Sequence, residues 1–358
     1  MNKVVFGDCR ESMRQMISDG VRVQMCVTSP PYYGLRDYGH PDQLGLEETP
    51  KQYIANMVEV FRLVKDLLAD DGVLWVNIGD SYAGSGKGRN ADGSHQEGGK
   101  QGTNAGTVVG KLSKTLSAEC KPKDLIGIPW MLAFALRADG WYLRQDIIWH
   151  KPNPMPESVT DRCTKAHEYL FLLSKNERYY FDSKAIAEPL GAASVARLAQ
   201  DVDSQAGSDR VQGKTNGTMK AVGGRRAAGN KSHKGTTAYE AGDERLRTKA
   251  GLVSFAERER EKVEAGDLEG TRNRRSVWTV ATVPYSGAHF ATFPPALIEP
   301  CILAGSRTGD IVLDPFFGSG TTGQVSQALG RQWIGCELNP AYKELQDARV
   351  SQQGMVFA

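Results

Sequence analysis

Short apolar runs separated by helical patterns constrain the fold of this chain more than any other feature. The runs lie at 4–6, 21–27, 73–78, 145–149, 169–173, 311–313 and 333–336. Strands that alternate with helices are typical of parallel sheets covered by helices on both faces. The sequence therefore predicts an α/β fold with a doubly wound, mostly parallel sheet of seven strands.

The clearest helix begins at a capping box. In Thr49-Pro50-Lys51-Gln52 a threonine precedes a proline, and a glutamine follows three residues after the threonine, which is a typical helix start. Apolar residues then recur at helical spacing over 53–68, and Gly72 is expected to end this helix. Pro340 is expected to start another helix near the end of the chain.

Two glycine-rich stretches carry an excess of positive charge. Residues 83–123 have a net charge of +4 and residues 191–275 of +5, whereas the whole chain has only +2, so the remainder carries −7. Both stretches are poor in large apolar residues, which is typical of solvated loops. Segregated basic segments beside a globular core are also what a protein that follows a phosphate backbone requires.

Composition argues against several other classes of protein. No apolar run approaches the ~20 residues of a membrane span, and the apolar run near the N-terminus is too short for a secretory signal. The six cysteines are scattered without CxxC spacing, which predicts neither a metal site nor a disulfide framework. We expect a cytoplasmic protein that holds no metal ion.

The first motif with chemical content is Thr28-Ser29-Pro30-Pro31-Tyr32, directly after an apolar strand. Ligands bind beyond the carboxyl ends of strands in such sheets. The two prolines fix the backbone and remove two amide donors, while the carbonyl groups stay free to accept. A hydroxyl, a rigid carbonyl and an aromatic face suit a planar group that bears an NH₂. The alternative is a proline-rich turn packed by an aromatic residue.

The second motif also follows an apolar strand. It reads Asp314-Pro315-Phe316-Phe317-Gly318-Ser319-Gly320-Thr321-Thr322. Its glycines allow a close backbone approach to a ligand and open a helix. About twenty residues later, Glu337 ends a second strand, where a carboxylate can accept hydrogen bonds from ribose hydroxyls. This combination is typical of the nucleoside-binding half of a Rossmann-like fold.

Together the two motifs resemble those of S-adenosylmethionine-dependent DNA methyltransferases that modify N4 of cytosine or N6 of adenine. Residues 28–32 look like the family's catalytic (D/N/S)PP(Y/F/W) motif, and 314–322 look like its cofactor motif. Their order is similar to that of the permuted subgroup called beta. The resemblance covers about residues 1–80, 124–190 and 276–358, with further matching blocks at 6–9, 147–154, 167–169 and 289–294. Phe293 departs from the family, which more often has lysine there.

The resemblance implies roles for individual residues. Tyr32 would stack on a base flipped out of the duplex, with Tyr33 nearby. The Ser29 hydroxyl and the carbonyl of Pro30, followed by Pro31, would accept hydrogen bonds from the amino group. No covalent enzyme intermediate is needed, so we expect Cys9 and Cys26 to be core residues. The implied contacts to S-adenosylmethionine are Asp8, Thr28, Thr292, Asp314, Pro315, Phe316, Gly318, Gly320, Thr321 and Glu337.

The resemblance also implies a domain organisation and double-stranded DNA as partner. Residues 1–190 would form the catalytic half, with 83–123 as a basic loop, and 276–358 the cofactor half. Residues 191–275 would form the target-recognition region between them. The candidate DNA contacts are Lys151, Arg225, Arg226, Arg272, Arg274 and Arg275, whereas Trp278 is expected in the core.

Several alternatives stay open at this point. Serine at the first motif position resembles cytosine-N4 enzymes more often, but the preference over adenine is slight. RNA and protein-glutamine methyltransferases use a related motif, although they usually place the cofactor motif first. An inert DNA-binding module is disfavoured by the intact motifs. The resemblance implies a homodimer and a bacterial or phage origin; no nuclease is evident, so a solitary enzyme and the partner of a restriction endonuclease are both open.

Overall fold

The computed structural model describes residues 2–35, 40–83, 120–191, 271–282 and 293–351. The chain divides into two compact units. The first combines Met1–Ile186 with Arg275–Ala358, and the second is Ala187–Arg274. Within the described residues, no helix is long and apolar enough to cross a membrane.

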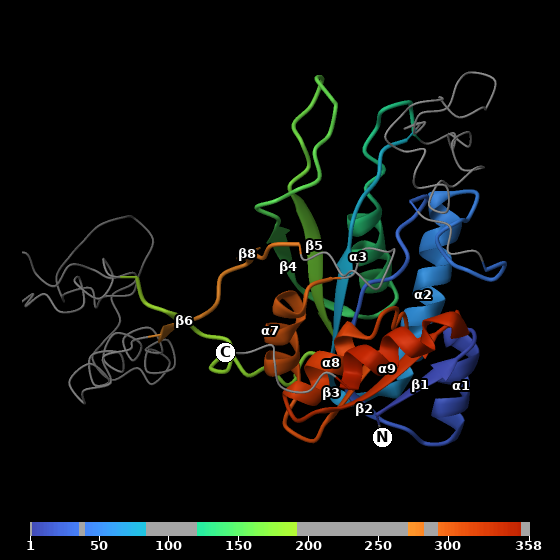
Figure 1. Cartoon of the computed structure of the whole chain (residues 1–358), viewed down its shortest axis with the longest axis vertical. Helices are drawn as coiled ribbons and strands as arrows, with labels where there is room; N and C mark the ends of the chain where they lie inside the picture. Colours follow the sequence, from blue (N-terminus) through green and yellow to red (C-terminus); the bar gives the residue numbers. More distant parts are fainter. Residues whose placement is uncertain (1, 36–39, 84–119, 192–270, 283–292, 352–358) are drawn as a thin grey trace, which may run out of the picture. The chain divides into compact units, whose positions relative to one another are not determined.

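The first unit contains a mixed, mostly parallel sheet (Figure 1). Its strands are β1 Lys3–Phe6, β2 Val23–Thr28, β3 Leu68–Ile78, β4 Tyr142–His150, β5 His167–Ser174, β8 Val277–Thr279, β9 Ile311–Asp314 and β10 Gln332–Glu337. Their order is β1-β10-β9-β2-β3-β5-β4-β8, and only β5 runs antiparallel to both of its neighbours. The predicted fold class is confirmed, and all seven predicted runs form strands.

The sheet has eight strands in the described residues rather than the predicted seven. The additional strand, β8, pairs with the outer edge of β4. It has three residues, of which only Trp278 is buried, so its sequence carries no strand periodicity. Trp278 packs 6.2 Å from Trp75 in the core, as the sequence predicted.

Helices cover both faces of the sheet, which makes it doubly wound. They are α1 Cys9–Ser18, α2 Pro50–Leu67, α3 Ile128–Ala138, α7 Pro295–Gly305, α8 Thr321–Ala328 and α9 Lys343–Ser351, the last preceded by a 3₁₀ turn over Pro340–Tyr342. Residues of α1, α2 and α3 share one apolar core with one face of β2 and β3. Residues of α7 and α8 form a second core on the opposite face.

The predicted start of α2 is confirmed and its predicted end is wrong. Thr49 and Gln52 form the reciprocal capping box, with Pro50 in the first turn. The helix ends at Leu67, and Gly72 lies within β3. A Cβ atom on Gly72 would come within 2.9 Å of the Ala69 carbonyl oxygen, so the glycine serves a close backbone approach in the strand.

The second unit is described at its two ends only. There β6, Glu188–Pro189, pairs antiparallel with β7, Thr271–Arg272, and Arg272 Nε lies 3.3 Å from Glu188 Oε2. This unit spans nearly the region that the sequence assigned to target recognition. Its role in reading DNA stays a prediction.

Candidate active site

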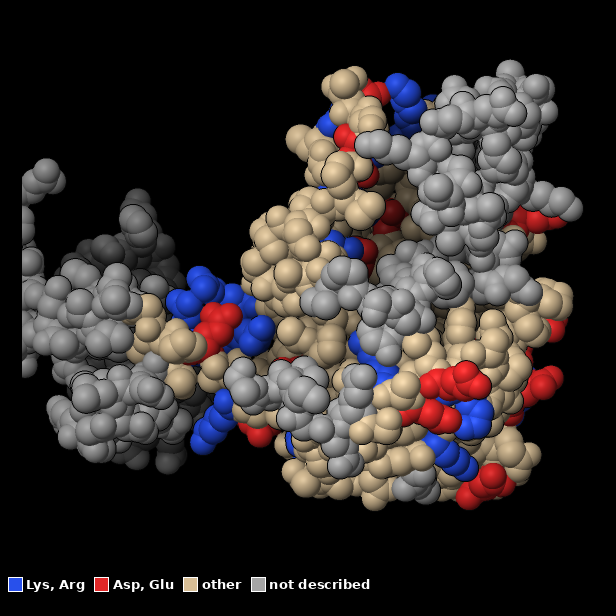
Figure 2. All heavy atoms as spheres, viewed as in Figure 1, with Lys and Arg blue, Asp and Glu red and all other residues tan. Residues whose placement is uncertain are grey.

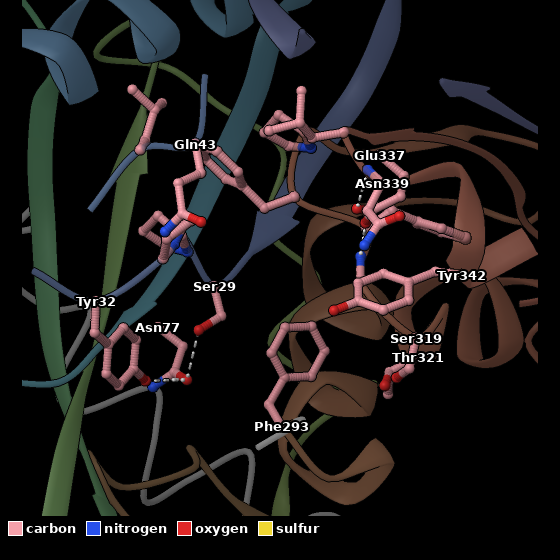
Figure 3. A pocket seen from close by; sticks show the side chains of 18 of the residues that line it. Ser29, Tyr32, Gln43, Asn77, Phe293, Ser319, Thr321, Glu337, Asn339 and Tyr342 are labelled. Carbon is pink, nitrogen blue, oxygen red and sulfur yellow. Dashed lines mark hydrogen bonds between the residues drawn. The ribbon is translucent and has the colours of Figure 1, made fainter. Parts of the chain in front are cut away.

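The carboxyl ends of neighbouring strands bring the two sequence motifs together. In the sheet order, β2 lies between β9 and β3, so the segment after Thr28 and the segment after Asp314 emerge side by side. A cavity of about 800 Å³ opens between them. Figure 3 shows Ser29, Tyr32 and Asn77 on one side of it, facing Glu337, Asn339 and Tyr342 on the other.

A buried carboxyl joins the two motifs behind the cavity wall. Asp314 accepts hydrogen bonds from the hydroxyls of Thr28 and Thr322, each at 2.6 Å, and from the Phe316 amide at 3.0 Å. Burial raises the pKa of Asp314 to about 6, although these three hydrogen bonds oppose the rise. The side chain is only 1% exposed, so its position depends on these donors.

Three of the predicted cofactor contacts lie outside the lining of the cavity, and their contact with a cofactor stays a prediction. Thr28, Asp314 and Gly320 do not line the cavity. The side chains of Thr28 and Asp314 are bonded to each other in the interior, and Gly320, at φ +88°, leads into α8. In this geometry the three residues hold the two loops in position.

The wall of the cavity that holds the predicted cofactor residues is centred on Glu337. One of its oxygens accepts from the Gly318 amide at 2.8 Å and the other from the Asn339 amide at 2.9 Å. Burial raises the pKa of Glu337 to about 7. Each carboxylate oxygen has a second lone pair, so Glu337 can still accept hydrogen bonds from a ligand.

Other predicted cofactor residues also reach this wall. The cavity is lined by Asp8, Pro315, Phe316, Gly318 and Thr321. Asp8 caps α1 through the Arg10 amide at 2.7 Å and pairs with the Arg10 guanidinium at 2.6 Å. Burial by itself would raise the pKa of Asp8, but the hydrogen bonds from Arg10 outweigh it and lower the pKa below its ordinary value.

The opposite wall holds the predicted catalytic residues. The Ser29 hydroxyl lies 3.4 Å from Asn77 Oδ1, and the Tyr32 hydroxyl donates to Glu168 Oε2 at 2.6 Å. The Tyr32 ring lies against Gly79, where an added Cβ would come within 2.6 Å of it. The Tyr53 hydroxyl bonds the Pro31 carbonyl at 2.8 Å.

Lys151 lies in this wall rather than on an open basic surface. Its ammonium group pairs with Glu168 Oε1 and lies 4.2 Å from the centre of the Trp149 ring. Lys151 therefore balances the charge of the carboxylate that holds Tyr32. The DNA contact of Lys151 stays a prediction; the structure shows its ion pair with Glu168 in the wall of the cavity.

Sequence reasoning missed part of both walls. Asn77 and Glu168 line the cavity beside Ser29 and Tyr32, and Ser319, Asn339 and Tyr342 line it beside Glu337. Glu168 lies in the block 167–169, which resembles the family, so this resemblance could have identified it as a site residue. Asn77 lies inside an apolar strand, where the sequence gives no sign that its side chain would reach the cavity.

Cys9 and Cys26 have suppressed thiol reactivity, and the second tyrosine lies away from the cavity. Burial raises the pKa of Cys9 to about 12 and that of Cys26 well above its ordinary value, so neither thiol is a ready nucleophile. Tyr33 is buried against Tyr53, with 5.6 Å between ring centroids, and does not line the cavity. In the described ranges, no group of His, Cys, Asp or Glu side chains is arranged to hold a metal ion.

The predicted DNA contacts are described only in part. Arg225 and Arg226 lie outside the described residues, as does Thr292, which the sequence predicted as a cofactor contact. Arg272, beside Arg274 and Arg275, pairs with Glu188. On the face shown in Figure 2, the coloured acidic and basic side chains are intermixed.

Comparisons with known proteins agree with the two motifs. A family model described as DNA methylase, N6_N4_Mtase, matches residues 23–348. The Type II methyltransferase M.Cfr9I of Citrobacter freundii is 41% identical, over 95% of this chain and 84% of the relative. M.SmaI of Serratia marcescens is 40% identical, over 97% of this chain and 90% of the relative.

A solved structure shares the fold. The PvuII DNA methyltransferase, whose title calls it cytosine-N4-specific, aligns with a TM-score of 0.54 and 16% identity, over 99% of this chain and 88% of that one. S-adenosylmethionine is the methyl donor of the family. The family model matches most of the chain, the relatives are about 40% identical, and the two motifs lie on facing walls of one cavity. The chain therefore belongs to the N6_N4_Mtase family of DNA methylases.

Proposed function

We propose that this protein transfers a methyl group from S-adenosylmethionine to the exocyclic amino group of a base in double-stranded DNA, with N4 of cytosine favoured over N6 of adenine. One observation carries the proposal: hydrogen-bond acceptors and an aromatic face line one wall of a cavity whose other wall is a glycine-rich loop with a buried glutamate. A cavity of about 800 Å³ is of the size that ligand sites have.

The cofactor wall fits the proposed methyl donor. Glu337 offers acceptor lone pairs for ribose hydroxyls, and the apolar Phe316 offers a surface for the adenine ring. Gly318, at φ +52°, leaves the loop backbone open to a close approach. When bound, S-adenosylmethionine supplies a methyl group activated by a sulfonium centre.

The catalytic wall would activate a weak nucleophile. The lone pair of a nucleobase amino group is delocalised into the ring, so the nitrogen must be drawn towards tetrahedral geometry. If the Ser29 hydroxyl donates to Asn77 Oδ1, its own lone pairs face outward as acceptors. Within the described residues no donor is bonded to the Pro30 carbonyl, which makes it the second acceptor. Tyr32 would hold the flipped base by stacking.

Cytosine is favoured by the serine at the first motif position, because family members with serine there act on cytosine more often. Relatives named Type II methyltransferases, at about 40% identity, support a role beside a restriction endonuclease. The basic segments 83–123 and 191–275 would supply the affinity for phosphates.

The proposal is tested by sequencing that detects modified bases in DNA from cells that express this chain. We expect one modified base in one short sequence context, and no modification with the Ser29→Ala variant. Calorimetry should show that Ser29→Ala still binds S-adenosylmethionine. Unmodified DNA from cells with folded, cofactor-binding wild-type protein would overturn the proposal, and adenine N6 modification would overturn the cytosine assignment.

A further inference from the structure

The segment between β4 and β5 carries a row of residues out of the cavity. Alternate residues Trp149, Lys151, Asn153 and Met155 all line it. Exposure rises along this row, from 3% at Trp149 to 84% at Met155. The row therefore runs from the buried floor of the cavity to its exposed rim. Met155 is therefore the outermost residue of the catalytic wall.

Met155 is conspicuous by its exposure. No other large apolar side chain in the described parts of the chain is as exposed. It stands between Pro154 and Pro156, each of which fixes its own φ and restricts the residue before it. The backbone at Met155 therefore loses little conformational freedom when this residue binds a partner. The position is suited to a contact that the isolated protein does not make.

The segment that carries Met155 is anchored on both sides. The Asn153 amide group bonds the Thr282 backbone twice, donating to its oxygen at 3.2 Å and accepting from its nitrogen at 3.0 Å. On the returning side, Arg162 pairs with Glu157 at 2.6 Å and lies over the Tyr82 ring at 4.0 Å. Figure 1 shows the segment, in light green, extending beyond the ends of β4 and β5.

We propose that Met155 enters the DNA stack and fills the space that the target base leaves when it turns into the cavity. This inference rests on the proposed function. A base can enter only through the cavity mouth, so the vacated site in the duplex lies next to the rim, where Met155 stands. Proteins that unstack DNA use apolar side chains, methionine among them, as wedges. The flexible thioether fits irregular apolar spaces.

The wedge acts on base opening and on no other step. Turning a paired base out of the duplex costs a few kcal/mol, and less when the base is already unpaired. Met155→Ala should therefore slow methylation of a normally paired target at least tenfold. On a duplex with an abasic site opposite the target, the loss should shrink to within about twofold. Met155→Leu, which keeps an apolar wedge, should retain most of the activity.

Single-turnover methylation of these two duplexes, built on the sequence found for the wild-type protein, tests the inference. Val159→Ala is the matched control, since Val159 is exposed on the same segment and does not line the cavity. Equal losses on both duplexes would overturn the wedge and indicate a general DNA contact. Weaker S-adenosylmethionine binding by Met155→Ala would place Met155 on the cofactor instead. The absence of any modified base in DNA from cells with the wild-type protein would refute the proposed function rather than the wedge.

Discussion

The hydrogen bond between Tyr32 and Glu168 should be worth a measurable share of the reaction rate. The Tyr32 hydroxyl lies 2.6 Å from Glu168 Oε2, and the other oxygen of Glu168 pairs with Lys151. A hydrogen bond to a charged group contributes roughly 1.5–3 kcal/mol. Since each ~1.4 kcal/mol is a factor of ten in rate, Tyr32→Phe should lower kcat roughly 10- to 150-fold if the bond holds the ring in its reactive position.

A double-mutant cycle separates this role from other effects of the same substitutions. Tyr32→Phe keeps the ring, and Glu168→Gln keeps an acceptor oxygen, so Glu168→Gln should be less impaired than Glu168→Ala. If the two side chains act through one bond, the Tyr32→Phe, Glu168→Ala protein should be about as slow as the slower single variant. The rates are measured by single-turnover methylation at saturating DNA, with cofactor affinity and melting temperature as controls. If the rate loss of the double variant equals the product of the two single-variant losses, Tyr32 and Glu168 do not act through one hydrogen bond.

Three further substitutions test the walls of the cavity. Burial raises the pKa of Glu337 to about 7 from an ordinary 4.5, so between these pH values the folded protein binds more protons than the unfolded protein. The free energy of unfolding should therefore fall as pH rises from 4.5 to 7. Denaturant titrations of Glu337→Gln should show a weaker decline over this pH range. Thr28→Val removes one of the two donors to a buried Asp314 oxygen, which keeps only the Phe316 amide, and should cost roughly 1–3 kcal/mol of unfolding free energy at pH 7. Gly79→Ala would push a Cβ into the Tyr32 ring and should lower kcat at least tenfold, whereas Gly191→Ala, with open space around it, should leave kcat unchanged.

The sequence predicts the fold well where residues alternate or cap regularly. Seven apolar runs are strands, and the capping box at Thr49 starts α2. It fails at β8, whose three residues gain their strand geometry only from pairing with β4. The sequence-based prediction also fails at Gly72. A glycine after a helical pattern suggests a helix end, whereas here the neighbouring backbone of Gln24 leaves no room for a side chain.

The residues of the candidate site are predictable where they lie together in a contiguous motif. They are not predictable where strand pairing brings together residues from distant parts of the chain. Asn77 and Glu168 reach the cavity because β3 and β5 pair antiparallel, with Ile78 opposite Tyr169. No local pattern encodes that register. For Lys151 the residue was identified but not its environment, since a lysine in a loop suggests DNA contact until its partner Glu168 is known.

The hydrogen bond between Thr28 and Asp314 joins two motifs that lie far apart in the chain. The residues are 286 positions apart, yet β2 and β9 are parallel neighbours, so both strands end at the same edge of the sheet. One Asp314 oxygen holds Thr28, directly before the catalytic motif, and the other holds Thr322, in the first turn of α8. A shift of either loop must break a buried hydrogen bond to a carboxyl group. Because this costs more than a surface contact would, the acceptors on one wall stay in register with the cofactor loop on the other.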